Sequence, residues 1–286
     1  MARFADKIGR HRLSLGPGAR LASVALISLM ALAGCVDASK SHVTPELARR
    51  EMTLRDIPYD EKSFVAHARE GDLRAVNLFL AAGMSPNARD ENGETPLLAS
   101  AARGEIRIVQ TLIAGGADVN AKDKDGLTAL MRATRDGAAA MTKALLDARA
   151  DVNLKSNDGA TALMYASWKE RLEIVRALLD GGASIEANDE ETGTALSWAA
   201  FFNRVSMAQL LLERGADPNP KNKKGVTALM IAASKGNTEM ARLLLDRGAD
   251  ARARASDGRT AFVWANLGRH EETARLIKER TEGAKK

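Results

Sequence analysis

A spacing of 33 residues organises most of this chain. Threonine recurs at that interval, at Thr95, Thr128, Thr161, Thr194, Thr227 and Thr260. A large apolar residue stands two positions after each threonine, at Leu97, Leu130, Leu163, Leu196, Leu229 and Phe262. A small residue stands five positions after it, at Ser100, Ala133, Ala166, Ala199, Ala232 and Ala265. A repeat of this length in one register predicts short units that stack, each burying its apolar face against its neighbours.

Each unit also carries signals for the beginning and end of helices. The recurring threonine is typical of an N-cap, where its hydroxyl accepts a hydrogen bond from the first amides of a helix. Gly-Ala-Asp recurs at 116–118, 215–217 and 248–250, and its glycine suits the left-handed residue that ends a second helix. With the Thr95-Pro-Leu-Leu opening, these residues resemble the ankyrin repeat. The resemblance implies an all-α solenoid of helix–turn–helix units joined by hairpin tips.

One further unit precedes the first threonine. Phe64, Ala68 and Gly71 keep the register, with Lys62 at the threonine position. The sequence therefore predicts about seven units over residues 61–286. Residues 35–60 form a tether, either a disordered spacer or a helix starting at the Thr44 cap and stopped by Pro58.

Three departures from the repeat predict local differences in backbone. Arg149 stands where the other units have the glycine that ends the second helix. Glu170 stands at the end of a first helix, where Gly104, Gly137 and Gly236 stand in other units. The hairpin glycine of the fifth unit, Gly193, comes one position late. The last unit has a charged second helix, as expected of a repeat that caps the array.

The first 34 residues have the pattern of an export signal. A basic stretch over 1–20 precedes an uncharged run over 21–33, which as a helix would span roughly 20 Å of the ~30 Å hydrocarbon layer. This favours a signal peptide over a membrane-spanning helix. Leu32-Ala33-Gly34-Cys35 resembles the bacterial lipobox, and Cys35 is the sole cysteine. The resemblance implies cleavage between Gly34 and Cys35 and a lipid on the Cys35 thiol.

The lipobox resemblance also implies a location. Val36, rather than aspartate, follows the cysteine, which in Gram-negative sorting favours the periplasmic face of the outer membrane. The periplasmic face of the inner membrane is the alternative. Two or three acyl chains would attach the protein stably to the bilayer without a spanning helix.

Charge and residue types argue against nucleic-acid binding and catalysis. Residues 1–34 hold five of the 42 basic residues and one of the 37 acidic residues, so the remainder carries a net charge of only +1. A polyanion partner such as nucleic acid is therefore not expected. His42, His67 and His270 are the only histidines after the signal and lie far apart in the sequence. We expect no enzyme activity, no metal and no cofactor, and an unidentified envelope protein as the partner.

Aromatic residues mark the expected binding surface. In ankyrin proteins the concave face consists of the hairpin tips and the exposed side of the first helices. The residues that fall on that side are Tyr165, Trp168, Trp198, Phe201, Phe202 and Trp264. They could form a hot spot for a protein partner, or they could cover one another and nearby methionines. An alternative function is a glycan- or peptide-binding protein, or an immunity-type inhibitor, that uses the same groove.

Overall fold

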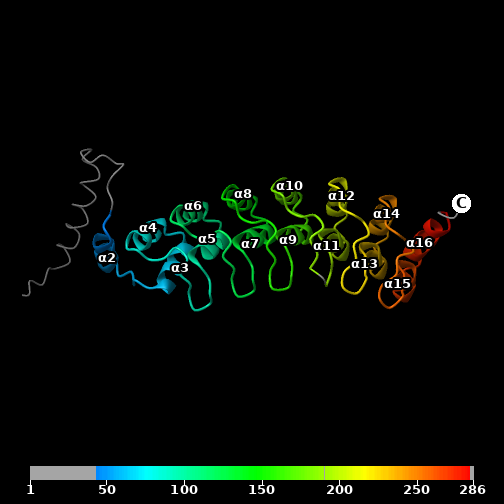
Figure 1. Cartoon of the computed structure of the whole chain (residues 1–286), viewed down its shortest axis with the longest axis horizontal. Coiled ribbons are helices and arrows are strands. Elements are labelled where there is room, and N and C mark those ends of the chain that lie inside the picture. The colour runs from blue at the N-terminus through cyan, green and yellow to red at the C-terminus, as the bar shows by residue number, and fades with distance from the viewer. Residues whose placement is uncertain (1–42, 190, 284–286) are drawn as a thin grey trace, which may run out of the picture.

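The computed structural model describes residues 43–189 and 191–283 as a single row of paired helices (Figure 1). The described residues form fifteen helices and no β-strand, which confirms the predicted all-α repeat solenoid. None of these helices is both long and apolar enough to cross a membrane. The proposed signal peptide, its cleavage site after Gly34 and the lipidation site Cys35 lie outside the described residues.

Seven helix pairs follow the first helix, α2 (Pro45–Leu54). The inner layer is made of the helices that begin at the threonine register: α3 (Glu61–Glu70), α5 (Pro96–Arg103), α7 (Ala129–Asp136), α9 (Ala162–Trp168), α11 (Ala195–Phe201), α13 (Ala228–Ser234) and α15 (Ala261–Leu267). The outer layer is made of their partners: α4 (Leu73–Ala81), α6 (Ile106–Ala114), α8 (Ala139–Asp147), α10 (Leu172–Asp180), α12 (Val205–Glu213), α14 (Thr238–Asp246) and α16 (Glu271–Gly283). Long loops project from one side of the row between consecutive pairs (Figure 1).

Small residues allow the helices to pack closely. The alanines five positions after the threonine, such as Ala166, Ala199 and Ala232, have no exposed surface. Leu97 and Leu98, at the second and third positions of their unit, are also fully buried against the neighbouring units. Burial of this kind contributes about 25 cal/mol per Å² of apolar surface, and most of it comes from stacking. The core therefore runs continuously along the array.

Threonine caps are only partly as predicted. Thr95 and Thr128 accept hydrogen bonds from the amides of Leu98 and Met131, at 3.2 Å and 3.3 Å. Thr194 and Thr260 have the same extended backbone but make no such bond. The shared threonine thus marks where each inner helix begins, while its hydroxyl stabilises only some of them. At α2, Thr44 caps the amide of Leu47 at 3.3 Å.

A ladder of side chains links successive hairpins. At the position six residues before each threonine, a side chain donates to the backbone carbonyl of the residue 33 positions later. The links are Arg89 to Lys122, Lys122 to Lys155, Lys155 to Asn188, Asn188 to Lys221 and Lys221 to Arg254, with donor–acceptor distances of 2.7–3.2 Å. Each hairpin is therefore held in register by the one before it.

The last repeat is capped on one helix only. On α16 the charged residues Glu271, Glu272 and Arg275 are exposed, as predicted. On α15, however, Phe262 and Leu267 remain 36% and 63% exposed. No further repeat follows within the described residues to cover them, and the inner helix of the last unit keeps the apolar pattern of an interior one.

Left-handed residues occur at the predicted departures. Arg149 has φ 61° and Glu170 has φ 56°, while the late Gly193 has φ 118°. Asn203 and Arg269 take the same conformation as Glu170 at the equivalent positions of their units, with φ 54° and 59°. A residue with a Cβ is strained there, because its side chain crowds the following carbonyl.

Arg149→Gly is expected to raise the free energy of unfolding by about 1 kcal/mol, because glycine adopts positive φ without this strain. Chemical denaturation of the full chain measures the change. Gly182→Arg is the matched reverse substitution: it lies at the equivalent position of the next unit, has φ 86°, and a Cβ there would meet no atom within 4 Å. It should cost a similar amount. A loss of stability in Arg149→Gly would contradict the assignment of strain to this residue.

Candidate functional site: the inner face of the repeats

The hairpin loops and the inner helices together form one surface, which we call the inner face. On it, each hairpin and the helix that follows place two side chains nine residues apart in contact. Arg132 donates to Asp123 through Nε at 3.0 Å, the Tyr165 hydroxyl donates to Ser156 at 3.4 Å, and Trp198 Nε1 donates to Asp189 at 2.6 Å. The same register position is thus used with different chemistry in successive units.

The carboxylates of these pairs also close the hairpins. Asp189 accepts the backbone N–H groups of Thr192 and Gly193 at 2.8 Å on the oxygen that does not bind Trp198. Asp123 accepts the amides of Asp125 and Leu127 in the same way. Since both oxygens of each carboxylate are occupied, these residues are structural and not free to act as an acid or base. The sequence analysis did not single them out, although their recurrence five positions before the threonine was the available signal.

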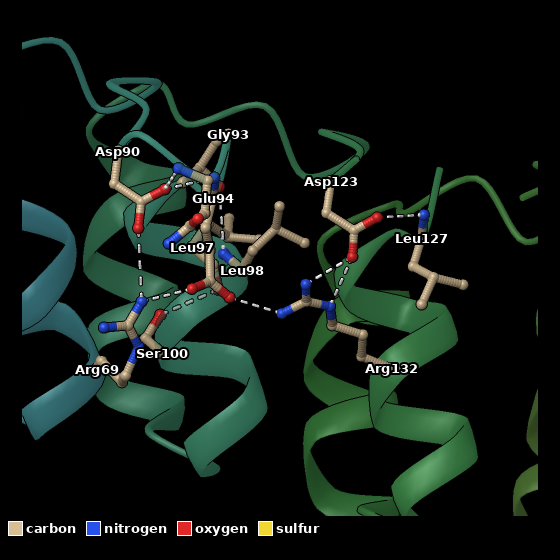
Figure 2. Close-up of polar contacts among 12 residues, drawn as sticks. Arg69, Asp90, Gly93, Glu94, Leu97, Leu98, Ser100, Asp123, Leu127 and Arg132 are labelled. Atoms are coloured by element: carbon tan, nitrogen blue, oxygen red, sulfur yellow. Dashed lines mark hydrogen bonds and ion pairs between the residues drawn. The ribbon is translucent and has the colours of Figure 1, made fainter. Parts of the chain in front are cut away.

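Ion pairs fill the part of the inner face nearest the N-terminus (Figure 2). Arg132 bonds to Glu94 at 2.6 Å as well as to Asp123, and the other oxygen of Glu94 lies 2.5 Å from Arg69. Arg69 also lies 3.7 Å from Asp90. Burial lowers the pKa of Arg132, but its bonds to Asp123 and Glu94 and their charges raise the pKa by more, so it ends above its usual value. Here the cations and carboxylates of three units satisfy one another.

Aromatic rings fill the inner face of the fourth and fifth units. We call Tyr165, Trp168, Trp198, Phe201 and Phe202 the aromatic cluster. The Tyr165 and Trp198 ring centres are 5.8 Å apart, those of Trp168 and Phe202 5.3 Å, those of Trp198 and Phe202 6.1 Å, and those of Phe201 and Phe202 5.0 Å. These separations are within the range of favourable aromatic pairs.

The rings of the cluster differ in exposure. Tyr165 is only 8% exposed, and burial raises the pKa of its hydroxyl by more than the hydrogen bond with Ser156 lowers it. Trp168, Trp198 and Phe202 are partly buried, while Phe201 is 43% exposed. The cluster therefore has both features considered from the sequence: its rings cover one another, and one of them remains open to a partner.

Two expectations about the aromatic residues need correction. The ring that contacts Trp168 is that of Phe202, not that of Phe201, the residue in the equivalent position of its unit. Trp264 makes no ring contact with the cluster in the part of the chain that the structure describes, because it lies two units further along. The surface that can bind through aromatic side chains is thus smaller than the sequence suggested.

Two lysines lie on the exposed rings of the cluster. Lys169 Nζ is 4.1 Å from the centre of the Trp168 ring, and Lys235 Nζ is 4.0 Å from that of Phe201. Both are exposed cation–π contacts of the kind worth roughly 0.5–1 kcal/mol. Neither ammonium has a carboxylate partner within residues 43–189 and 191–283. This part of the inner face therefore combines apolar surface with unpaired positive charge.

Comparison with known proteins identifies the family. A family model for ankyrin repeats, in three copies, matches residues 64–156, 98–189, 141–222 and 196–286. This chain belongs to the ankyrin-repeat family. Solved structures agree: the ankyrin repeat domain of Bcl-3, described as a unique member of the IkappaB protein family, has a TM-score of 0.68 and 30% identity over 75% of this chain and 97% of its own. The human ASB11 ankyrin repeat domain has a TM-score of 0.65 and 27% identity over 76% and 96%. Curated protein sequences give no match.

Ankyrin-repeat proteins are typically interaction scaffolds, and membership therefore indicates a protein–protein interaction module. Among the described residues, no group of three or more His, Cys, Asp or Glu side chains is placed to hold a metal ion. His67 lies 3.4 Å from Asp72 in the first ankyrin repeat, and His270 lies against the carbonyl of Ser234 near the last. The structure does not bring these two histidines together.

The last ankyrin repeat lacks one partner of the recurring polar pair. Trp264 occupies the register position of Trp198, but the position of Asp189 is taken by Ala255. Accordingly, Trp264 Nε1 is buried and has no hydrogen-bond partner among the described residues. A buried donor without an acceptor costs about 1–3 kcal/mol, so this ankyrin repeat is less stable than its sequence register allows.

Ala255→Asp is expected to raise the free energy of unfolding by about 1 kcal/mol, since a carboxylate there can accept from Trp264 Nε1 while its other oxygen accepts from the hairpin amides. Ala255→Asn is the matched control, because its single oxygen can serve the hairpin but its amide nitrogen cannot accept from the indole. Denaturation curves of both variants, with and without Trp264→Phe, measure the coupling. Equal effects of Asp and Asn would show that the indole plays no part.

Proposed function

We propose that this ankyrin-repeat protein is a lipid-anchored interaction module of the bacterial cell envelope that binds a protein partner through the aromatic cluster. The observation that carries the binding half is the exposure of Phe201, 43%, above the partly buried rings of Trp168 and Phe202. An exposed aromatic residue surrounded by partly buried apolar surface is the usual composition of an interface hot spot.

The anchoring half of the proposal rests on the sequence Leu32-Ala33-Gly34-Cys35 and on Cys35 being the only cysteine. We place the mature protein at the periplasmic face of the outer membrane, with the inner membrane as the alternative. Eight residues separate Cys35 from Val43, and at no more than ~3.6 Å per residue they reach less than about 30 Å. The tether would therefore hold the first helices close to the membrane surface, with the inner face available to envelope proteins.

Cys35→Ser is expected to abolish lipid attachment and leave the full-length precursor, because the serine hydroxyl cannot replace the thiolate nucleophile in the acylation step. Labelling of cells with a clickable fatty-acid analogue, followed by gel electrophoresis of the purified protein, measures both results. Val36→Ala is the control, since it leaves the thiol in place and should be labelled normally. Equal labelling of Cys35→Ser and the parent chain would refute the anchor.

A photo-crosslinking residue at position 201 of the full chain, in cells of the natural host, tests the binding half. We expect a crosslinked protein adduct of defined mass from this position. The control is the same residue at Gln209, which is exposed on the outer helix α12 of the same ankyrin repeat and should give no such adduct. An adduct that contains only glycan would favour the glycan-binding alternative, and the absence of any adduct would reject the binding face.

A further inference from the structure

Positive charge surrounds the aromatic cluster without being neutralised. Lys169 and Lys235 lie over the rings of Trp168 and Phe201, on either side of the exposed surface. Both ammonium groups are exposed and have no carboxylate within 4.0 Å among the described residues. An ammonium over a ring directs part of its charge to the π-face but still has donors available on its outer side.

The nearby carboxylates are already engaged. Glu170 lies 3.7 Å from Arg204, and Asp189 binds Trp198 and two backbone amides. Arg204 in turn donates to the backbone carbonyl of Trp168 at 3.1 Å. No acidic side chain of the described part of these units is therefore left to pair with the two lysines.

The opposite half of the inner face shows what a neutralised surface looks like here. Arg69 and Arg132 are each paired with carboxylates of neighbouring units (Figure 2). A charged partner gains little by approaching groups that already satisfy one another, since it would have to displace those pairs. The unpaired charges of the inner face are thus concentrated at the aromatic cluster.

We infer that the partner segment held at the aromatic cluster is an acidic polypeptide stretch, in which an apolar side chain contacts Phe201 and Trp168 while flanking aspartates or glutamates pair with Lys169 and Lys235. This inference rests on the proposed function and specifies its partner. Complementary charge of this kind chooses between partners and speeds their encounter. A basic stretch would be repelled by both lysines, which adds discrimination against wrong partners.

Charge reversal tests the inference. Lys169→Glu with Lys235→Glu, in the full chain with the crosslinking residue at position 201, should reduce the adduct at least tenfold. The neutral pair Lys169→Gln with Lys235→Gln should reduce it at least threefold. Lys143→Glu with Lys278→Glu makes the same change in net charge on the outer helices α8 and α16 and should leave the adduct within twofold of the parent. All three double variants should melt at the same temperature as the parent, because every substituted lysine is exposed.

Mass spectrometry of the crosslinked peptide supplies the second readout. We expect an excess of Asp and Glu over Lys and Arg within about six residues of the attachment point, roughly the reach of two lysines one ankyrin repeat to either side. An adduct that is unchanged by reversal of Lys169 and Lys235, or that maps to a neutral or basic segment, overturns this inference and leaves the proposed function standing. No protein adduct in the parent chain rejects both.

Discussion

Replacing Trp198 by alanine is expected to lower the free energy of unfolding by about 3–4 kcal/mol, close to the usual cost of truncating a large aromatic side chain in a core. The Trp198 ring contacts those of Tyr165 and Phe202, and its Nε1 donates to Asp189, a residue only 7% exposed. The substitution therefore opens a cavity within the aromatic cluster and leaves one carboxylate oxygen without its donor. Urea denaturation followed by circular dichroism measures the loss.

Two variants separate the contributions. Trp198→Phe keeps most ring contacts and removes the donor to Asp189, so it should cost about 1–3 kcal/mol. Phe201→Ala should cost less than about 1 kcal/mol, because much of its ring already lies in solvent and little buried surface is lost. If Phe201→Ala destabilised the protein as much as Trp198→Ala, Phe201 would be a core residue and the binding-face assignment would be wrong.

Arg132→Ala is expected to lower the free energy of unfolding by about 2–4 kcal/mol, because it removes one member of a buried ion pair and leaves its partners uncompensated. The Arg132 side chain is 18% exposed, and the carboxylates that it binds, Asp123 and Glu94, are 6% and 16% exposed. Thermal and urea denaturation of the full chain measure the effect.

Arg69→Ala is the control for the same network. It also removes a partner of Glu94, but the Arg69 side chain is 44% exposed. Water can replace it, and exposed ion pairs contribute at most about 1 kcal/mol. Equal losses in the two variants would mean that burial does not set the strength of this network.

The repeat architecture was predictable because one backbone requirement recurs in every unit. Threonine marks the start of each inner helix, and the small residue five positions later marks where helices pack closely. Arg149 was predictable for the same reason, since its place in the register requires positive φ whatever the side chain. Such features depend on position alone, and a 33-residue interval reveals position directly.

The polar pairs and ring contacts were not predictable in the same way. The pairs Asp123 with Arg132 and Asp189 with Trp198 occupy one register position with unlike residues, so a search for similar residues does not find them. The contact between Trp168 and Phe202 depends on which way two neighbouring rings turn. That choice is made by packing between units, which a one-dimensional pattern does not contain.

The ladder of hairpin links has a consequence for how the protein opens. Each link joins a hairpin only to the next one, as Lys122 does to Lys155, so the loss of one terminal unit removes one link and leaves the others intact. Such an array melts from its ends inward, like a zipper. The last unit, with the unpaired indole of Trp264 and the uncovered Leu267, would open first. The aromatic cluster sits between repeats with neighbours on both sides, so its surface would stay assembled while the terminal unit opens and closes.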